Sequence, residues 1–441
     1  MHWAFPALRY VPAQPTHRGP PVTDRHSDPA DLGTLTWVFG RIGILSFGGP
    51  AAQIALMHRA LVDERDWLTE DQFLRALSFC MMLPGPEAMQ LATYAGWRLR
   101  GVPGGLIAGA LFVLPGALVI MALALAYAAV GDLPLVQALF LGIKATVVVI
   151  VIQALLRLSK KALATTAHWV LAGLAFAALF LFGLPFPLVI ALAAAYGAWT
   201  ADLSKAPPAD TPARPETWRT VLIWGALWAA PALVLWALQA EFLLGLAVFF
   251  AKLAVVTFGG AYAVLAYMTQ AVVTEHGWLS TAQMIDALGL AETTPGPLIL
   301  VTQFVGHIAG VEQGGIGLGL LAGLVVLWMT FVPCFLWIFA GAPYLEAITT
   351  RPRIGAALAA VTAAVVGVIL SLSLWFALHV FFGRIDDAPL GLALPVPDLA
   401  SFDPRAAGLF LLAAALLLWR QWPLLPVLGL MACAGAGLSL L

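Results

Sequence analysis

Charge is scarce in this sequence, and that scarcity excludes most soluble folds. Only 10% of the 441 residues are charged and 61% are hydrophobic, whereas a soluble domain carries about 25% charged residues. The composition therefore predicts an all-α polytopic membrane protein with a lipid-facing surface. The formal net charge of -1 argues against a polyanionic partner such as nucleic acid.

Cysteine and catalytic motifs are also scarce. The three cysteines lie far apart in apolar surroundings, so neither a disulfide framework nor a zinc site is expected. The sequence contains no His-Glu-x-x-His motif, no Gly-x-Ser-x-Gly motif and no aspartate pair within an apolar segment. A membrane-embedded protease or transferase needs such a group, so we expect no enzyme, no metal and no cofactor.

Long hydrophobic runs are what the sequence has in abundance. A spanning helix needs roughly 20 apolar residues, and several of the candidate segments are near or below that length. The thirteen candidates are 34–57, 73–97, 103–130, 135–156, 167–183, 185–201, 221–239, 243–270, 284–309, 315–342, 355–382, 406–419 and 423–440.

Basic residues predict the orientation of these segments. If the N-terminus is cytoplasmic and every segment crosses, 14 of the 22 Lys and Arg residues fall inside, among them Arg157 and Lys161, and five fall outside, among them Arg384. This bias agrees with the positive-inside rule. The remaining three are embedded: Arg41, Lys252 and Lys144, whose side chain is expected to reach along its helix toward the membrane surface.

An internal repeat relates the two halves of the chain. At a constant offset of 211 residues, Phe47-Gly48-Gly49 matches Phe258-Gly259-Gly260, and Pro84-Gly85-Pro86 matches Pro295-Gly296-Pro297. Arg41 likewise matches Lys252. Thr69 with Gln72, and Ser280 with Gln283, each predict a helix capping box at matching positions.

Counting the segments predicts how the repeats are related. Each repeat has about six hydrophobic segments, and one extra segment lies between them, so the second repeat enters the membrane from the opposite side. This is the inverted-topology repeat of many secondary transporters. If the Pro-Gly-Pro segments re-enter instead of crossing, the repeats become parallel. The expected division is an N-terminal cytoplasmic arm (1–33), a first repeat (34–201), a polar linker (202–220), a connecting segment (221–241) and a second repeat (242–441).

The repeated motifs break helices inside apolar segments. Proline removes a backbone donor and glycine permits a bend, and such breaks survive in a membrane where protein or a water-filled cavity covers the free carbonyls. The new helix N-terminus after each break favours an anion. With Arg41 and Lys252 as embedded cations, the four breaks predict an electropositive cavity for an oxyanion.

These motifs resemble those of the chromate ion transporter family, in its long two-domain form. The resemblance rests on FGGP, DERDWLTEDQFLRAL and LPGPEAMQLATYAGWRLRG in the first repeat, and on FGGAYAVL and LAETTPGPLILVTQFVGHIAG in the second. It implies antiparallel domains and proton-motive-force-driven chromate efflux across the inner membrane, which confers chromate resistance. It also implicates the two Phe-Gly-Gly and the two Pro-Gly-Pro motifs. Ala261 stands where the first repeat has Pro50, so that break is expected to be softer.

Other polar residues near the breaks have two readings each. Glu87 and Glu292 are candidate proton-coupling carboxylates, although Glu87 also fits a first-turn residue that stabilises the helix dipole. Four residues one to two turns beyond the breaks either bind the oxyanion or hydrogen-bond between helices: Gln90, Thr93, Thr302 and Gln303.

The expected function is a secondary transporter that exports chromate, with protons as the coupling ion. A sulfate or other oxyanion carrier, or an anion channel, stays an alternative, because chromate and sulfate are tetrahedral dianions of similar size. A multi-pass protein of the plasma membrane with membrane lipids as neighbours is expected, and a homodimer stays open.

Overall fold

The computed structural model describes residues 31–202, 217–258, 260–387 and 395–439. Most of the predicted N-terminal arm (1–33) and of the predicted linker (202–220) lies outside the described residues, as does Gly259 of the second Phe-Gly-Gly motif. The described chain is almost entirely helical, as the composition predicts for a polytopic membrane protein.

The first half is a series of helices interrupted at the predicted motifs. It contains α1 (Leu32–Leu45), α2 (Gly49–His58), the π-helix η1 (Arg59–Asp63), α3 (Glu70–Cys80), α4 (Glu87–Val130), α5 (Pro134–Ala162), α6 (Thr166–Phe180) and α7 (Phe186–Trp199).

The second half follows the same order after α8 (Thr217–Ala237), including a π-helix at the matching position. It contains α9 (Glu241–Val256), α10 (Ala261–Gln270), η3 (Ala271–Glu275), α11 (Thr281–Thr293), the 3-10 helix η4 (Leu298–Leu300), α12 (Val301–Gly341), η5 (Ala342–Tyr344), α13 (Leu345–Thr349), α14 (Pro352–Phe381), the paired strands β1 (Ile385–Asp387) and β2 (Pro395–Pro397), η6 (Leu399–Ser401), α15 (Pro404–Ala414), η7 (Ala415–Trp419) and α16 (Leu424–Ser439).

Local sequence signals account for many of these boundaries. Thr69 with Gln72 caps α3, and Ser280 with Gln283 caps α11, each through a reciprocal pair of hydrogen bonds. Both predicted capping boxes are therefore confirmed. Pro134 and Pro352 stand at the first turns of α5 and α14, where the missing N–H has no helical partner to lose.

Helices α4 and α12 are each two helices joined at a sharp reversal. The reversal in α4 lies at Arg100 and Gly101, and that in α12 at Gly314 and Gly315. In α4 the two arms pack so closely that a Cβ on Gly96 would lie 2.3 Å from the carbonyl oxygen of Gly104. The first arms, 87–99 and the matching 301–313, are each about 20 Å long at 1.5 Å per residue, which is shorter than the roughly 30 Å hydrocarbon core.

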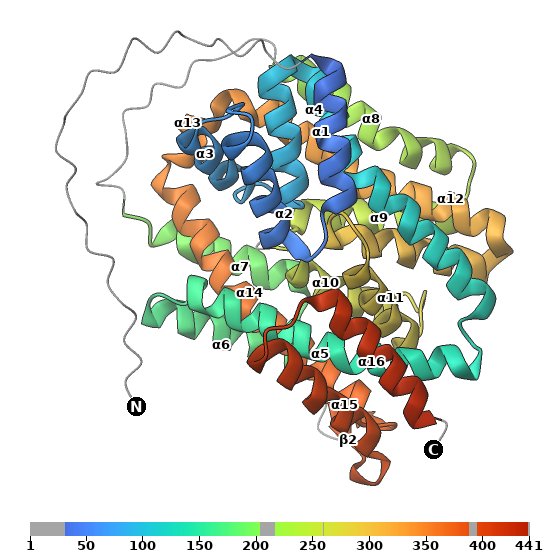
Figure 1. Cartoon of the computed structure of the whole chain (residues 1–441). Coiled ribbons are helices and arrows are strands. Elements are labelled where there is room, and N and C mark those ends of the chain that lie inside the picture. Colours follow the sequence, from blue (N-terminus) through green and yellow to red (C-terminus); the bar gives the residue numbers. More distant parts are fainter. Residues whose placement is uncertain (1–30, 203–216, 259, 388–394, 440–441) are drawn as a thin grey trace, which may run out of the picture.

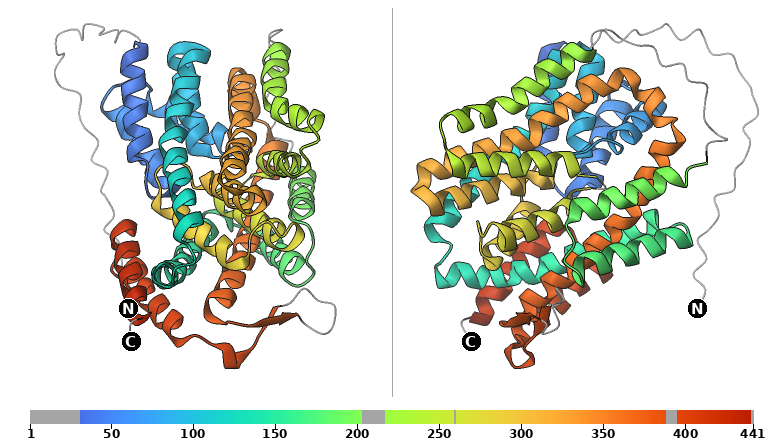
Figure 2. Two further views of the ribbon diagram at one scale, coloured as in Figure 1. Left: turned by 90° about the vertical axis from the view of Figure 1, so that its right-hand side faces the viewer. Right: turned by 180° about the vertical axis from the view of Figure 1, so that it is seen from behind.

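The two halves exchange packing partners. Helix α5 packs against α15 and α16 of the second half, and α14 packs against α6 and α7 of the first half (Figure 1). Helices α4 and α12 pack against each other, and α1 and α9 cover them at matching places (Figure 2). One hydrophobic core therefore contains residues of both halves.

Five of the described helical segments are long and apolar enough to cross a membrane: Glu87–Val130, Pro134–Ala162, Thr217–Ala237, Leu298–Tyr344 and Pro352–Phe381. Their lipid-compatible surfaces are extensive, since many large hydrophobic side chains are exposed, including Leu118 and Leu192, each 60% exposed. Soluble domains rarely expose so much apolar surface, because its contact with water is unfavourable. The chain is therefore an integral membrane protein.

Candidate functional site

The four interrupted segments meet at the centre of the molecule. The backbone N–H of Gly85 donates to the carbonyl of Thr257 at 2.9 Å, and the N–H of Gly296 donates to the carbonyl of Ser46 at 3.0 Å. Ser46 and Thr257 are related by the same 211-residue offset that relates the two glycines. Each Pro-Gly-Pro motif is therefore hydrogen-bonded beside the Phe-Gly-Gly motif of the other half.

Side chains that sequence reasoning did not single out complete this junction. Gln53 is buried, and its Nε2 donates to the carbonyl oxygens of Gly296, at 2.7 Å, and Ser46, at 3.2 Å. The hydroxyl of Ser46 also lies 3.0 Å from the N–H of Gly296, as an acceptor. Free carbonyls at a helix break are costly in an apolar interior, and Gln53 satisfies two of them.

Glycine is required at these breaks by backbone conformation. Gly48, Gly49, Gly85, Gly260 and Gly296 have φ values of 89°, 79°, 117°, 99° and 87°. These lie in the region that L side chains rarely adopt. The repeat of glycine at matching positions therefore reflects a backbone path that both halves share.

A cavity of about 800 Å³ opens beside the junction; we call it the charged cavity. Its walls come from both halves, and four charged residues line it: Glu87, Arg157, Lys161 and Glu292. The glycines at 48, 49 and 260 also line it, as does Tyr262. The first and second Phe-Gly-Gly motifs therefore both contribute backbone to one cavity.

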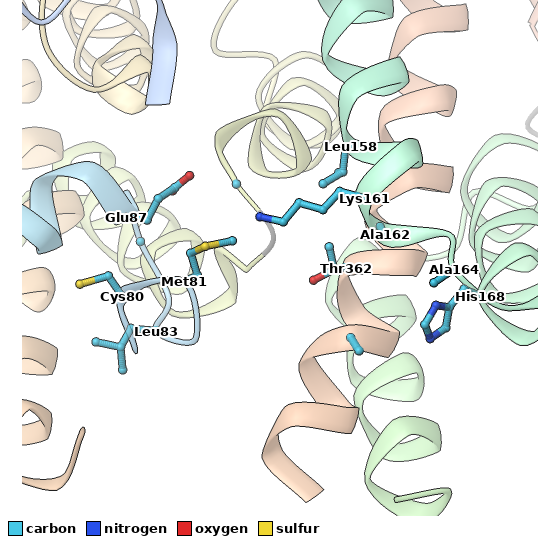
Figure 3. A pocket seen from close by; sticks show the side chains of 13 residues that line it. Cys80, Met81, Leu83, Glu87, Leu158, Lys161, Ala162, Ala164, His168 and Thr362 are labelled. Atoms are coloured by element: carbon cyan, nitrogen blue, oxygen red, sulfur yellow. The ribbon is translucent and has the colours of Figure 1, made fainter. Parts of the chain in front are cut away.

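An adjoining cavity of about 380 Å³ shares Glu87 and Lys161 with the charged cavity and includes Gly85 of the first Pro-Gly-Pro motif. Figure 3 shows Lys161 extending into this space from α5, while Glu87 lies on the opposite wall at the start of α4. Thr362 of α14 lies beside Lys161 on its wall, and His168 of α6 lies at the end farther from Glu87.

The charged cavity combines two cations, Arg157 and Lys161, with two carboxylates, Glu87 and Glu292. Arg157 and Lys161 are four residues apart on α5 and so share one helix face. Two cations on one wall can hold a small dianion, with Arg157 presenting a planar fork and Lys161 a compact charge.

Glu292 is further held by a tyrosine from the neighbouring helix. The hydroxyl of Tyr262 donates to Oε1 of Glu292 at 2.8 Å. This contact fixes the carboxylate at the end of α11, immediately before the second Pro-Gly-Pro motif, while leaving Glu292 on the cavity wall.

Arg41 and Lys252 lie elsewhere. Both are exposed, and neither is among the residues that line the charged cavity or the cavity beside it. The guanidinium of Arg41 instead lies 5.8 Å from the centre of the exposed Trp37 ring, one turn earlier on α1. The structure thus does not bring the two predicted cations to the helix breaks, because α1 packs through the face that carries Val38, Phe39 and Ile42.

The two Pro-Gly-Pro motifs differ in their surroundings. Pro84 and Gly85 are only partly buried, beside the cavities, whereas 295–297 and the following turn are fully buried. A Cβ on Gly116 would lie 2.2 Å from the carbonyl oxygen of Pro295, so α4 packs directly on the second motif. The helix N-terminus after the first motif, with Glu87 in its first turn, therefore lies at the charged cavity, whereas residues 295–297 are not among those that line it or the cavity beside it.

The predicted amides and threonines are buried and bonded within the protein. Gln90 Nε2 donates to the carbonyl of Pro84 at 2.7 Å, and Gln303 Nε2 donates to that of Ala117 at 3.2 Å. Thr93 and Thr302 donate to carbonyls of their own helices, those of Met89 and Ile299, at 2.9 Å and 2.8 Å. Gln90 thus supports the first motif directly, whereas these bonds tie the threonines to their own helices.

Phe47 and Phe258 flank the junction in equivalent ways. Each is half-buried, and each backbone N–H donates to the carbonyl two residues earlier, Leu45 or Val256, at 2.9 Å or 3.0 Å. The residues that the sequence did not single out for the cavity are Arg157, Lys161 and Tyr262. The sequence shows the four-residue spacing of Arg157 and Lys161, but both were used only to predict which side of the membrane is cytoplasmic.

Comparison with known proteins agrees with this architecture. The profile of the chromate transporter family matches residues 33–198 and again residues 244–438. A chromate transport protein from Cupriavidus metallidurans is 31% identical over 89% of this chain and 94% of its own length. A chromate transport protein from Pseudomonas aeruginosa is 30% identical over 87% of this chain and 91% of its own length.

A probable chromate transport protein from Synechococcus elongatus is 32% identical over 78% of this chain and 84% of its own length. No solved structure matches the chain significantly. Because the family profile covers most of the chain in two successive copies, and because relatives at this level of identity align over nearly their whole length, the protein belongs to the chromate transporter family.

Proposed function

We propose that this protein is a secondary transporter that exports chromate from the cytoplasm across the inner membrane and so confers chromate resistance. The observation that carries the proposal is the charged cavity, where two cations, two carboxylates and three glycines of the helix breaks line one space. Family membership indicates a transporter rather than an enzyme. The names of the similar proteins favour chromate over sulfate.

The two halves are proposed to be inverted repeats, 34–201 and 242–441, joined by the linker 202–220 and the segment 221–241, with the N-terminus in the cytoplasm. The reciprocal hydrogen bonds of Gly85 and Gly296 support a pseudo-two-fold relation between the halves. The exchange of partners between α5 and α14 supports it as well. Alternating access then consists of one half rocking against the other around the junction.

The oxyanion is proposed to bind between the repeats, at the two Phe-Gly-Gly motifs and the first Pro-Gly-Pro motif, with Arg157 and Lys161 supplying the charge. This assignment moves the cationic role away from Arg41 and Lys252, because neither lines the charged cavity. The backbone N–H groups of the first turn of α4, which has no side-chain cap, add donors for the oxyanion oxygens.

The proton motive force is proposed to drive export. An inside-negative potential favours outward movement of a dianion by roughly 5 kcal/mol per 100 mV. Protonation of Glu87 or Glu292 removes a negative charge from the cavity, so proton occupancy and oxyanion occupancy are linked there. This linkage is proposed to couple chromate export to inward proton movement.

Everted membrane vesicles test the proposal, because their outer surface is the cytoplasmic face. Energised vesicles that contain the protein are expected to accumulate radiolabelled chromate, and an uncoupler is expected to abolish the uptake. Uptake that ignores the uncoupler would exclude transport driven by the proton motive force. Excess unlabelled sulfate that competes fully would show a general oxyanion carrier instead of a chromate carrier.

A further inference from the structure

A third cavity, of about 340 Å³, lies between α14, α10 and the α6–α7 connection. Tyr267, Thr269, Trp375 and His379 are among its lining residues, and we call it the aromatic cavity. Among its described lining residues there is no Asp, Glu, Lys or Arg. The mechanism proposed above does not use it.

Two walls of the aromatic cavity are related by the repeat to two walls of the charged cavity. Helix α14 matches α5 at an offset of 218 residues, which aligns their first prolines, Pro352 and Pro134. Five of the six charged-cavity positions of α5 then correspond to aromatic-cavity positions of α14: Ile150 to Val368, Gln153 to Ser371, Ala154 to Leu372, Arg157 to Trp375 and Lys161 to His379. The sixth, Leu158, corresponds to Phe376, which is not among the residues that line the aromatic cavity.

The second wall corresponds in the same way. At an offset of 238 residues, which aligns Pro423 with Pro185, residues 417, 418, 421 and 424 of the charged cavity match residues 179, 180, 183 and 186 of the aromatic cavity. Two walls of each cavity are therefore built from equivalent positions. The principal chemical difference on these walls is the replacement of two cations by a tryptophan and a histidine.

The histidine offers an oxyanion little. Nδ1 of His379 donates to the carbonyl of Trp375 at 2.8 Å, since a carbonyl only accepts. The neutral ring then has Nε2 as a lone-pair acceptor, which repels an oxyanion oxygen. The ring also packs on Trp375, with centroids 4.1 Å apart. Lys161 at the matching place presents donors and a fixed positive charge.

The two cavities lie toward opposite ends of the path if the repeats are inverted. The positive-inside rule predicts that the end of α5, with Arg157 and Lys161, is cytoplasmic. The end of α14, near Arg384, is then outside. Ile385 and Pro395, in the connection after α14, line the aromatic cavity, as expected for an opening toward that side.

We propose that the charged cavity captures the oxyanion from the cytoplasm and that the aromatic cavity is the exit on the outer face, with Trp375 and His379 in place of cations so that the dianion is released. This inference rests on the proposed function. The asymmetry does not set the direction of net transport, which the driving force decides. It sets a low KM for chromate on the cytoplasmic face and a high KM on the outer face.

Measurement of KM on both faces tests the inference. Uptake is measured in everted vesicles, which present the cytoplasmic face, and exchange is measured in right-side-out vesicles. The wild-type protein is expected to show a KM at least tenfold lower on the cytoplasmic face. Equal values on the two faces would overturn the inference while leaving chromate transport intact, whereas no uptake by the wild type would reject the proposed function itself.

Exchanging the equivalent residues sharpens the test. Lys161→His is expected to raise the cytoplasmic KM at least tenfold and to leave the outer KM unchanged. Lys161→Arg, which keeps the positive charge, is expected to keep the wild-type cytoplasmic KM. His379→Lys is expected to lower the outer KM at least tenfold and to slow release. Lys160→His is the matched control, because Lys160 lines neither cavity. Equal effects of Lys161→His and Lys160→His would overturn the inference.

Discussion

Lys144 of α5 forms an ion pair with Asp286 of α11, with Nζ 3.1 Å from Oδ1. The Asp286 side chain is 0% exposed and that of Lys144 is 16% exposed, and the hydroxyl of Tyr127 donates to Oδ2 of Asp286 at 2.8 Å. The sequence predicted that the Lys144 side chain extends to the membrane surface, and this ion pair shows that it does not. It ties α5 to the helix that precedes the second Pro-Gly-Pro motif.

Removing one partner of this pair is expected to destabilise the protein strongly. Lys144→Met leaves the Asp286 carboxylate buried without its cation, which costs about 3–5 kcal/mol. Replacing both, with Lys144→Met and Asp286→Leu, is expected to cost less than the sum of the single changes, because no uncompensated charge remains. Thermal unfolding of the purified protein in detergent measures this, and strictly additive effects would contradict the pairing.

Lys144 also shows what the sequence could and could not predict. The capping boxes of α3 and α11 depend on residues three positions apart, and both were predictable. The partner of Lys144 lies 142 positions away, and nothing in either local sequence specifies it. The same holds for Thr257, which accepts from Gly85: the repeat located the motifs, but a one-dimensional pattern does not say which carbonyl each motif meets.

The sequence predicted Arg41 at the oxyanion cavity, and the structure differs from that prediction for another reason. Its position in an apolar segment suggested a buried functional charge, but the buried residues of α1, Leu35, Val38, Phe39 and Ile42, define a helix face that excludes it. That periodicity was present in the sequence. Arg157 was counted as an orientation signal because a cation at the end of a hydrophobic segment usually is one.

Neutralising cations that line the charged cavity and cations that do not is expected to give different results. Arg41→Gln and Lys252→Gln are expected to leave the KM for chromate within about twofold of wild type, because neither residue lines the charged cavity. Arg157→Gln is expected to raise the KM about tenfold, which is roughly 1.4 kcal/mol of binding free energy. Uptake by everted vesicles, normalised to protein amount, measures all three. Loss of uptake in Arg41→Gln would return the cationic role to Arg41.

The cavity carboxylates are expected to control coupling. Glu87→Gln and Glu292→Gln keep size and hydrogen-bonding capacity but cannot bind and release a proton. Chromate added to energised everted vesicles is expected to dissipate the pH gradient with the wild type but not with these two variants. The control is Glu241→Gln, at an exposed residue in the first turn of α9, which is expected to behave like the wild type. A fluorescent pH probe reports the change. If both cavity variants still dissipate the gradient, neither carboxylate carries the proton.

The loop before α3 is expected to lose stability as pH rises. Nε2 of His58 lies 2.6 Å from Oε2 of Glu70, and this hydrogen bond raises the pKa of His58 above its ordinary value of 6.5. The protonated form is thus favoured in the folded state, and its contribution is present below the ordinary pKa and lost as pH rises through the raised one.

For this partly exposed pair the contribution is about 0.2–1 kcal/mol. His58→Gln is expected to lower stability at about pH 5.5 and to change it little at about pH 8. Unfolding midpoints of the wild type and the variant at the two pH values measure the difference. An effect of equal size at both values would show that the charge of His58 is not involved.

The glycines of the two Pro-Gly-Pro motifs are expected to be irreplaceable. In Gly85→Ala a φ of 117° becomes strained, and the new Cβ lies 2.9 Å from both the Cys334 sulfur and Nε2 of Gln90. The strain costs about 1–3 kcal/mol and displaces the amide that holds the carbonyl of Pro84. Gly296→Ala is strained in the same sense, with a φ of 87°.

The matched control is Gly173→Ala, since Gly173 lies within α6 and a Cβ there meets nothing within 4 Å. Both motif variants are expected to lose at least tenfold of chromate uptake per folded protein, whereas the control retains wild-type uptake. Detergent-extracted protein that elutes as a single species shows which variants are folded. In both motifs a glycine N–H donates to a carbonyl of the opposite half, so both are expected to be needed for transport. A loss of uptake in Gly85→Ala but not in Gly296→Ala would show that transport depends on the first motif and not on the second.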